Sequence, residues 1–196
     1  QMLLRQVHRV QAGETILVQA ASGGVGQLLC QWANHLGATV IGTVGSAEKA
    51  ALARASGCAH TILYREENFV DRVRESTHGE GVAVAYDSVG KDTFFGSLDC
   101  LASRGHLVNF GQSSGSVEPF QVSMLAPKSN SLTRPIVFAY TAQRARFEVM
   151  AGDLFDMVRQ GVLSVQAGHP FPLAQAARAH EALESRDRIG PLLLKP

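Results

Sequence analysis

The sequence predicts an α/β fold, a doubly wound parallel sheet of about six strands with helices on both faces. Short β-branched runs alternate with amphipathic helical stretches along most of the chain, which is the pattern of parallel strands joined by crossover helices. The first run, residues 15–21, is apolar on both faces, as a buried parallel strand is. A glycine-rich turn follows this run and leads into the first helix.

Hydrophobic periodicity separates the expected helices from the expected strands. In the first predicted helix, Val25, Leu29 and Trp32 recur at steps of four and three along one face. After these elements, residues 172–184 read as a further helix, a turn passes through Gly190, and residues 192–194 read as a strand without an obvious partner. The main predicted strands are residues 15–21, 39–44, 61–64, 82–87, 106–110 and 136–140, and the helices between and after them are residues 25–35, 47–55, 68–76, 93–101 and 145–160.

Composition narrows the class of protein. The 196 residues are 45% hydrophobic and 18% charged, enough for one well-packed domain and a small appendage. A net charge of +1 with scattered basic residues argues against a nucleic-acid or membrane-surface partner. No apolar run reaches the roughly 20 residues that span a bilayer, and we expect no signal peptide at the start of the chain. Because the sequence starts at Gln1 without an initiator Met, we expect it to be part of a longer protein.

The cysteines and histidines indicate a cytoplasmic protein without a metal centre. Cys30, Cys58 and Cys100 are far apart and lack CxxC spacing, so we expect free thiols and a cytoplasmic location. The seven histidines show no metal-ligand spacing, and we expect no bound metal. Asp87, at the end of a predicted strand, is expected to cap the following loop rather than to act as an acid or base.

The glycine turn, Ala21-Ser22-Gly23-Gly24-Val25-Gly26, predicts a dinucleotide site and a Rossmann fold. Glycines allow the backbone to approach a pyrophosphate, and the start of the following helix presents free N–H groups and the positive end of its dipole. The turn departs from the GxGxxG pattern because Ala21 replaces the first glycine. Its position between a buried strand and an amphipathic helix makes the signal specific.

The end of the second predicted strand favours NADPH over NADH. NAD-binding domains carry an acidic residue there for the adenosine ribose, and this sequence has none. Ser46 and Lys49 would instead hold a 2′-phosphate, by hydrogen bonding and by charge. Tyr64 would lie near the adenine. Lys49 as a solvated helix lysine, and Tyr64 as an ordinary strand-end aromatic, remain open alternatives.

Several stretches together resemble the zinc-independent quinone oxidoreductases, including the zeta-crystallins, of the medium-chain dehydrogenase/reductase superfamily. They cover almost the whole chain in order. The matching stretches are AASGGVG (20–26), GTVGSAEKA (42–50), YREE (64–67), YDSVG (86–90), SLDCL (97–101), NFGQSSG (109–115), TRP (133–135) and RAHEALESR (178–186).

The resemblance implies a set of cofactor contacts and a direct hydride transfer from NADPH to a quinone or similar electrophile. Catalytic residues cannot be assigned, because the N-terminal half of such enzymes, which carries the substrate pocket, is missing. The implied contacts are Gly23, Gly24 and Val25 at the pyrophosphate; Ser46, Lys49 and Tyr64 at the 2′-phosphate end; Ser88, Phe110, Gly111 and Ser113 toward the nicotinamide; and Arg186 reaching back to the phosphates.

The resemblance also implies a domain division and a homodimer. Residues 1–171 would form the NADP-binding Rossmann domain. Residues 172–196 would be a helix and a strand of the companion catalytic domain, which accounts for a strand without a partner. The predicted strand at residues 136–140, from Ile136 to Tyr140, would close the sheet and join two subunits into a homodimer.

Two other functions remain open. The same cofactor domain occurs in enoyl reductases of polyketide or fatty-acid synthesis, where the acceptor is an activated double bond such as an enone. A non-catalytic NADPH-binding or structural module, as in the lens crystallins of this family, is the second. YDSVG and NFGQSSG favour the quinone reductases.

Overall fold

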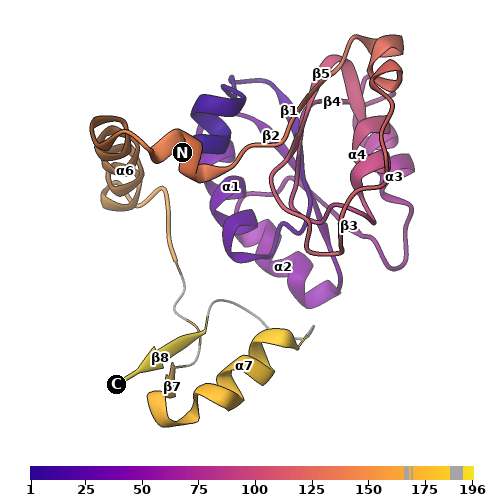
Figure 1. Cartoon of the computed structure of the whole chain (residues 1–196). Helices are drawn as coiled ribbons and strands as arrows, with labels where there is room; N and C mark the ends of the chain where they lie inside the picture. The colour runs from indigo at the N-terminus through magenta and orange to yellow at the C-terminus, as the bar shows by residue number, and fades with distance from the viewer. Residues whose placement is uncertain (166–167, 169, 186–191) are drawn as a thin grey trace.

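A six-stranded parallel sheet forms the centre of the protein, as expected. The computed structural model describes residues 1–165, 168, 170–185 and 192–196. Helices cover both faces of the sheet, with α1 and α2 on one side and α3 and α4 on the other (Figure 1). In spatial order the strands are β3 (His60–Leu63), β2 (Thr39–Val44), β1 (Thr15–Val18), β4 (Val82–Asp87), β5 (Leu101–Asn109) and β6 (Ser131–Thr133).

The order of the strands reverses between β1 and β4. β1 pairs in parallel with β2 on one side and with β4 on the other, so the two halves of the sheet meet at this seam. In open parallel sheets of this kind, ligands bind at the carboxyl ends of the strands beside such a reversal. The helices of the sheet domain are α1 (Gly24–His35), α2 (Ala47–Ala55), α3 (Phe69–Ser76), α4 (Phe94–Asp99), α5 (Val137–Thr141) and α6 (Arg144–Arg159), with a 3-10 helix η2 (Val122–Lys128) before β6.

Successive side chains of the strands point to opposite faces and build two cores. In β1, Ile16 and Val18 belong to the core under α1 and α2, whereas Leu17 belongs to the core under α3 and α4. All three side chains are fully buried, which explains why this strand reads as apolar on both faces.

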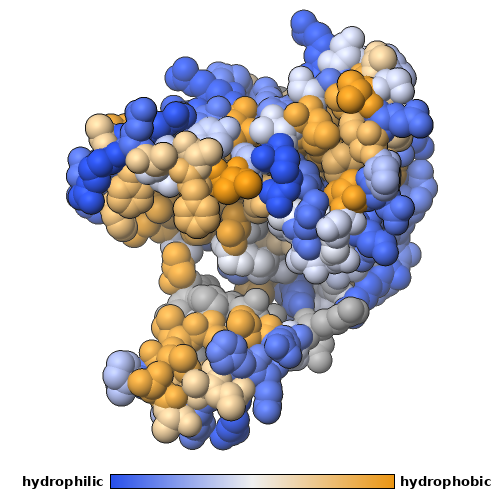
Figure 2. Space-filling view, in the orientation of Figure 1, coloured by the Kyte–Doolittle hydropathy of each residue, from blue (hydrophilic) through white to orange (hydrophobic). Residues whose placement is uncertain are grey.

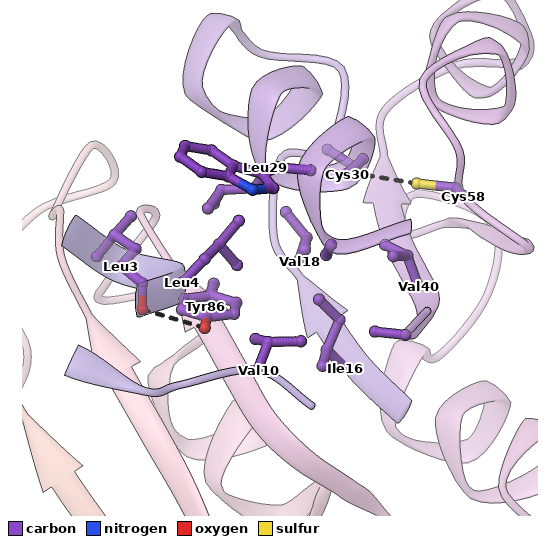
Figure 3. Close-up of a cluster of buried hydrophobic side chains, with 14 of the residues drawn as sticks. Leu3, Leu4, Val10, Ile16, Val18, Leu29, Cys30, Val40, Cys58 and Tyr86 are labelled. Carbon is purple, nitrogen blue, oxygen red and sulfur yellow. Dashed lines mark hydrogen bonds between the residues drawn. The ribbon is translucent and has the colours of Figure 1, made fainter. Parts of the chain in front are cut away.

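A short π-helix at the start of the chain, η1 (Met2–Val7), was not anticipated from the sequence. It places Leu3 and Leu4 in the core under α1, and the Tyr86 hydroxyl of β4 donates a hydrogen bond to the Leu3 carbonyl at 3.2 Å (Figure 3). α6 lies beside η1, since the Gln1 side-chain amide donates to the Asp153 carboxylate at 2.8 Å.

The sixth strand lies elsewhere than predicted. Residues 136–140 are not a strand, because α5 (Val137–Thr141) occupies this segment, and the exposed fraction of Phe138 is 78%. The sheet is closed instead by β6, whose Ser131 and Thr133 pair with His106 and Val108 of β5. A five-residue apolar run fits a strand and a helix equally well, and β6 has a single apolar residue, so periodicity pointed to the wrong segment.

The C-terminal strand has a partner that the sequence did not reveal. β8 (Leu193–Lys195) pairs in parallel with β7 (Pro170–Pro172), and η3 (Leu173–Gln175) and α7 (Ala176–Glu184) lie between them in the chain. The helix was expected, but the expectation of an unpaired strand was wrong. The turn predicted at Gly190 lies outside the described residues. Figure 1 shows this unit apart from the six-stranded sheet. Among the described residues, no helix is both long and apolar enough to cross a membrane.

Candidate functional site

The turn between β1 and α1 opens the candidate site at the carboxyl edge of the sheet. Ala20 adopts a left-handed conformation with φ of 53°, and its carbonyl accepts a hydrogen bond from the Gly23 N–H at 2.9 Å. Gly23 is the N-cap of α1, and Gly23, Gly24 and Val25 are exposed. The first turn of a helix leaves its N–H groups without partners in the helix, so this exposed end can receive an anion.

The glycines of the turn differ in how much space surrounds them. A Cβ atom at Gly26 would lie 2.3 Å from the Ala20 carbonyl oxygen, so only glycine allows α1 to approach β1 this closely. A Cβ atom at Gly24 would meet nothing within 4 Å, and the space beside it is open. Gly26 therefore serves packing, whereas Gly24 leaves room for a ligand.

The residues expected at the adenosine end lie together after β2 and β3. Ser46 is the N-cap of α2, and its hydroxyl oxygen accepts the Lys49 backbone N–H at 3.3 Å, which leaves its hydrogen available to a ligand. Tyr64 follows β3, is half exposed, and extends over Gly45, where a Cβ atom would lie 2.9 Å from the phenol oxygen. Sequence reasoning missed Gly45, whose lack of a side chain leaves room for the ring of Tyr64.

The residues expected toward the nicotinamide meet at the ends of β4 and β5. The Ser113 N–H donates to the Ser88 carbonyl at 3.1 Å, and a Cβ atom at Gly111 would lie 2.7 Å from the same oxygen. The Phe110 N–H donates to the Asp87 carbonyl at 2.8 Å. Ser88, Phe110, Gly111 and Ser113 therefore line one edge, although their contact with a cofactor stays a prediction. Arg186 lies outside the described residues.

Asp87 caps the loop after β4, as expected. Its buried carboxylate accepts the N–H groups of Val89 at 2.8 Å and Gly90 at 3.0 Å, together with the Thr93 hydroxyl at 2.9 Å. With these donors, Asp87 fixes the turn that carries Ser88, and its carboxylate has a structural role.

A buried set of polar side chains behind the site was missed from the sequence. Gln19, at the end of β1, bonds to Thr43 of β2 and to Ser97 of α4, and Ser97 bonds to Asp87. Polar residues inside apolar strands gave no local signal, because their partners are distant in the sequence.

The three cysteines are free and buried. The Cys30 and Cys58 thiols share a hydrogen bond, with their sulfurs 3.3 Å apart, between α1 and the loop before β3 (Figure 3). This hydrogen bond and burial raise the pKa of Cys30. In the described part of the chain, no group of three or more His, Cys, Asp and Glu residues could hold a metal ion.

The sequence is similar to a family of dehydrogenases and to several known reductases. Residues 24–154 match a family described as zinc-binding dehydrogenase. A quinone oxidoreductase from Pseudomonas aeruginosa is 46% identical over 197 residues, which cover all of this chain and 61% of that protein. A 2-haloacrylate reductase from a Burkholderia species is 45% identical over 198 residues, which cover all of this chain and 60% of that protein.

A solved structure shares the fold. The Escherichia coli quinone oxidoreductase complexed with NADPH superposes with a TM-score of 0.94 at 45% identity, over all of this chain and 61% of that one. The chain thus spans about 60% of the length of the relatives it matches.

Proposed function

Because the chain belongs to the zinc-binding dehydrogenase family, we propose that it is the NADPH-binding part of an oxidoreductase that transfers hydride to a quinone or a similar electrophile. The observation that carries this proposal is the carboxyl edge of the sheet. There an exposed glycine turn at the start of α1 accompanies a β2 end that has no acid and is followed by Ser46 and Lys49 at the start of α2. The NADPH complex of the similar E. coli enzyme supports the same cofactor.

The chain's own residues would bind and orient the cofactor. The N–H groups of Gly24 and Val25 would receive the pyrophosphate, with the positive end of the α1 dipole behind them. The Ser46 hydroxyl and the Lys49 ammonium would bind the 2′-phosphate, and Tyr64 would lie against the adenine. The edge at Ser88 and Phe110 would hold the nicotinamide. When bound, NADPH would supply the hydride, so the protein needs no nucleophile.

The residues described do not fit a zinc site, although the family name mentions zinc. Zinc sites in proteins combine three or four Cys, His or acidic ligands around one point. Within residues 1–165, 168, 170–185 and 192–196 no such group is present, and Cys30 and Cys58 face each other in the core.

The relatives favour two kinds of acceptor. Several are named quinone oxidoreductases, and one is named 2-haloacrylate reductase. A haloacrylate contains an activated carbon–carbon double bond, so reduction of such a bond is the second candidate function. The part of the relatives that this chain lacks would select between the acceptors.

Three further features belong to the proposal. The unit of residues 172–196, together with β7, would pack with a companion catalytic domain, supported by the greater length of the relatives. The free thiols support a cytoplasmic location. A homodimer would form at the β6 edge of the sheet beside the exposed residues of α5, in place of the strand expected at residues 136–140.

Titration of the chain with NADPH and with NADH tests the cofactor assignment. We expect tighter binding of NADPH, measured by the quenching or enhancement of its fluorescence. A folded chain that binds neither nucleotide would contradict the proposal. In a protein extended to the full length of the relatives, turnover with a simple quinone, compared with 2-chloroacrylate, would then identify the acceptor.

A further inference from the structure

A network of buried polar side chains, linked by hydrogen bonds, joins the turn after β1 to the turn after β4. Its members are Gln19, Thr43, Ser97 and Asp87, which are at most 2% exposed. Gln19 directly follows β1, and the others lie in β2, α4 and β4, so they come from both halves of the sheet. Buried polar groups are costly unless each is hydrogen-bonded, so this arrangement needs an explanation beyond core packing.

The hydrogen bonds of this network all point the same way, from Thr43 toward Asp87. The Thr43 hydroxyl donates to the Gln19 side-chain oxygen at 2.5 Å, and the Gln19 amide donates to the Ser97 hydroxyl at 3.0 Å. The Ser97 hydroxyl donates in turn to the Asp87 carboxylate at 3.1 Å. Each hydroxyl uses its single hydrogen once, so the donors and acceptors match from end to end.

At its other end, the hydrogen-bonded network reaches the glycine turn. The Ala20 N–H donates to the Thr43 hydroxyl oxygen at 3.2 Å, and the Ala21 N–H donates to the Thr43 carbonyl at 3.0 Å. Ala20 is in the left-handed region, which residues other than glycine rarely adopt, so it requires outside support. Thr43 supplies that support to two successive N–H groups.

The conformation of Ala20 determines where α1 begins. Its carbonyl accepts the Gly23 N–H at 2.9 Å, and the same oxygen lies where a Cβ atom of Gly26 would stand. A change in the orientation of Ala20 would therefore move the N–H groups of the first turn of α1. These are the groups to which we assign the pyrophosphate.

We propose that Thr43, held by Gln19, Ser97 and Asp87, is a positioning residue that fixes the glycine turn for the pyrophosphate of the dinucleotide. It would act through Ala20, without touching the cofactor. The inference rests on the proposed function. It predicts that loss of the Thr43 hydroxyl lowers the affinity for ligands that contain a pyrophosphate. The affinity for ligands that bind only at Ser46, Lys49 and Tyr64 should stay nearly unchanged.

The test compares two ligands and two substitutions in the chain as it stands. NADPH contains the pyrophosphate, whereas adenosine 2′-monophosphate (2′-AMP) carries only the adenosine end with its phosphate. Thr43→Val keeps the shape and removes the hydroxyl, and Thr43→Ser keeps the hydroxyl. We expect Thr43→Val to weaken NADPH binding about tenfold, because the Ala20 N–H loses its acceptor, and to weaken 2′-AMP binding less than about twofold. Thr43→Ser should restore NADPH binding.

Ser97→Ala removes a hydrogen bond farther from the glycine turn and is the variant to use if Thr43→Val does not fold. It should weaken NADPH binding by a smaller factor, about threefold, again with little effect on 2′-AMP binding. Lys49→Ala is the matched opposite, because it should weaken both ligands together. Thermal unfolding of each variant separates a loss of fold from a loss of binding.

The outcomes separate this inference from the proposed function. If the unchanged chain binds NADPH and a folded Thr43→Val binds NADPH as well, or loses both ligands equally, the positioning role is wrong and the cofactor assignment stands. If the unchanged chain binds neither ligand, the cofactor assignment fails and this inference fails with it. A selective loss of NADPH that Thr43→Ser restores would establish the role.

Discussion

Gly24 and Gly26 lie two residues apart at the start of α1, yet substitutions at them should have different effects. The space beside Gly24 is open, so Gly24→Val should leave the fold intact and place a branched side chain where a pyrophosphate must approach. Circular dichroism and thermal unfolding should stay near native, while NADPH affinity collapses. Retained affinity in the folded variant would mean that the phosphates bind elsewhere.

Gly26→Ala is the matched control. Its methyl group would collide with the Ala20 backbone, which is not a flexible side chain that can move aside. Overpacking of this kind costs about 1–3 kcal/mol, so we expect a lower free energy of unfolding in addition to weaker binding.

Lys49 tests the choice between the two nicotinamide cofactors. Ser46 caps α2 through the backbone N–H of residue 49, so Lys49→Ala should leave the helix in place. Loss of a charge-assisted phosphate contact should cost about 1.5–3 kcal/mol of NADPH binding energy and little of NADH binding energy. Lys49→Arg should keep most of the preference. Equal losses for both cofactors would remove Lys49 from the 2′-phosphate site.

His106 should make stability depend on pH. Its ring bonds to the Thr133 hydroxyl at 2.8 Å and lies beside His8, and burial, with a smaller effect of His8, lowers the pKa of His106 below 6.5. The unfolded chain then binds the proton more readily than the folded one. Stability should therefore be full above pH 6.5 and fall as the pH drops from 6.5 through the lower folded pKa.

Urea unfolding at a series of pH values measures this effect, and His106→Gln should flatten that part of the profile. A dependence that persists unchanged in His106→Gln would assign it to another group.

How far the sequence predicts the site depends on the distance over which each signal acts. Gly23 and Gly24 follow a strand directly, and Ser46 begins a helix, so local patterns place them at one edge of the sheet. Thr43 and Gln19 carry no such pattern, because their partners are brought together only by the pairing of β1 with β2 and by the packing of α4.

At the scale of the elements, the surface of α5 and α6 is unusually apolar. Figure 2 shows apolar side chains gathered over α6 and the segment before it. The first residue of this surface, Ile136, follows the end of β6, the outer strand of the sheet, after two residues. Its exposed apolar residues are Ile136, Val137, Phe138, Phe147, Val149, Phe155 and Val158.

A substitution in α5 tests whether this surface, with β6, joins two copies of the chain. Phe138→Glu should favour monomers in sedimentation experiments while the helix content stays unchanged, because a charge would be buried in the interface. Leu183→Glu, which is exposed on α7 and lies outside this surface, is the control for a general gain in solubility. A native chain that stays monomeric at high concentration would contradict the proposed dimer.

Most elements could be predicted from their periodicity, and the failures have a common cause. β1 to β4 were predicted within a few residues, because buried parallel strands are apolar on both faces. β5 begins at Leu101, five residues before its predicted start. β6 and β7 are three-residue strands of mixed character, and their place depends on pairing with β5 and β8. Such short strands have too few residues for a pattern.

At the scale of the whole molecule, we expect the isolated chain to bind NADPH and to leave quinones unreduced. Hydride transfer requires the nicotinamide and its acceptor to be held together in a cleft that excludes water. The chain contributes the edge at Ser88 and Phe110 and spans about 60% of the length of its relatives. Absorbance of NADPH measures turnover. A rate above that of free NADPH would place the acceptor site within these residues.

Amide hydrogen exchange should distinguish β8 from the strands of the six-stranded sheet. β8 pairs with three residues of β7, and Leu193 and Leu194 are 46% and 42% exposed, so its amides should be among the least protected. Protection equal to that of β1 would contradict this expectation.

The central position of β4 has a consequence for the time course of folding. β1, β2 and β3 are synthesised before β4 and can pair with one another, but the other edge of β1 stays unpaired until Val84, Ala85 and Tyr86 have emerged. η1 waits as well, since its Leu3 carbonyl binds the Tyr86 hydroxyl. Pairing over such a long stretch of chain is slow. The arrival of β4 should therefore be the step that commits the chain to its fold, and until then a nascent chain exposes the edge of β1 to its neighbours.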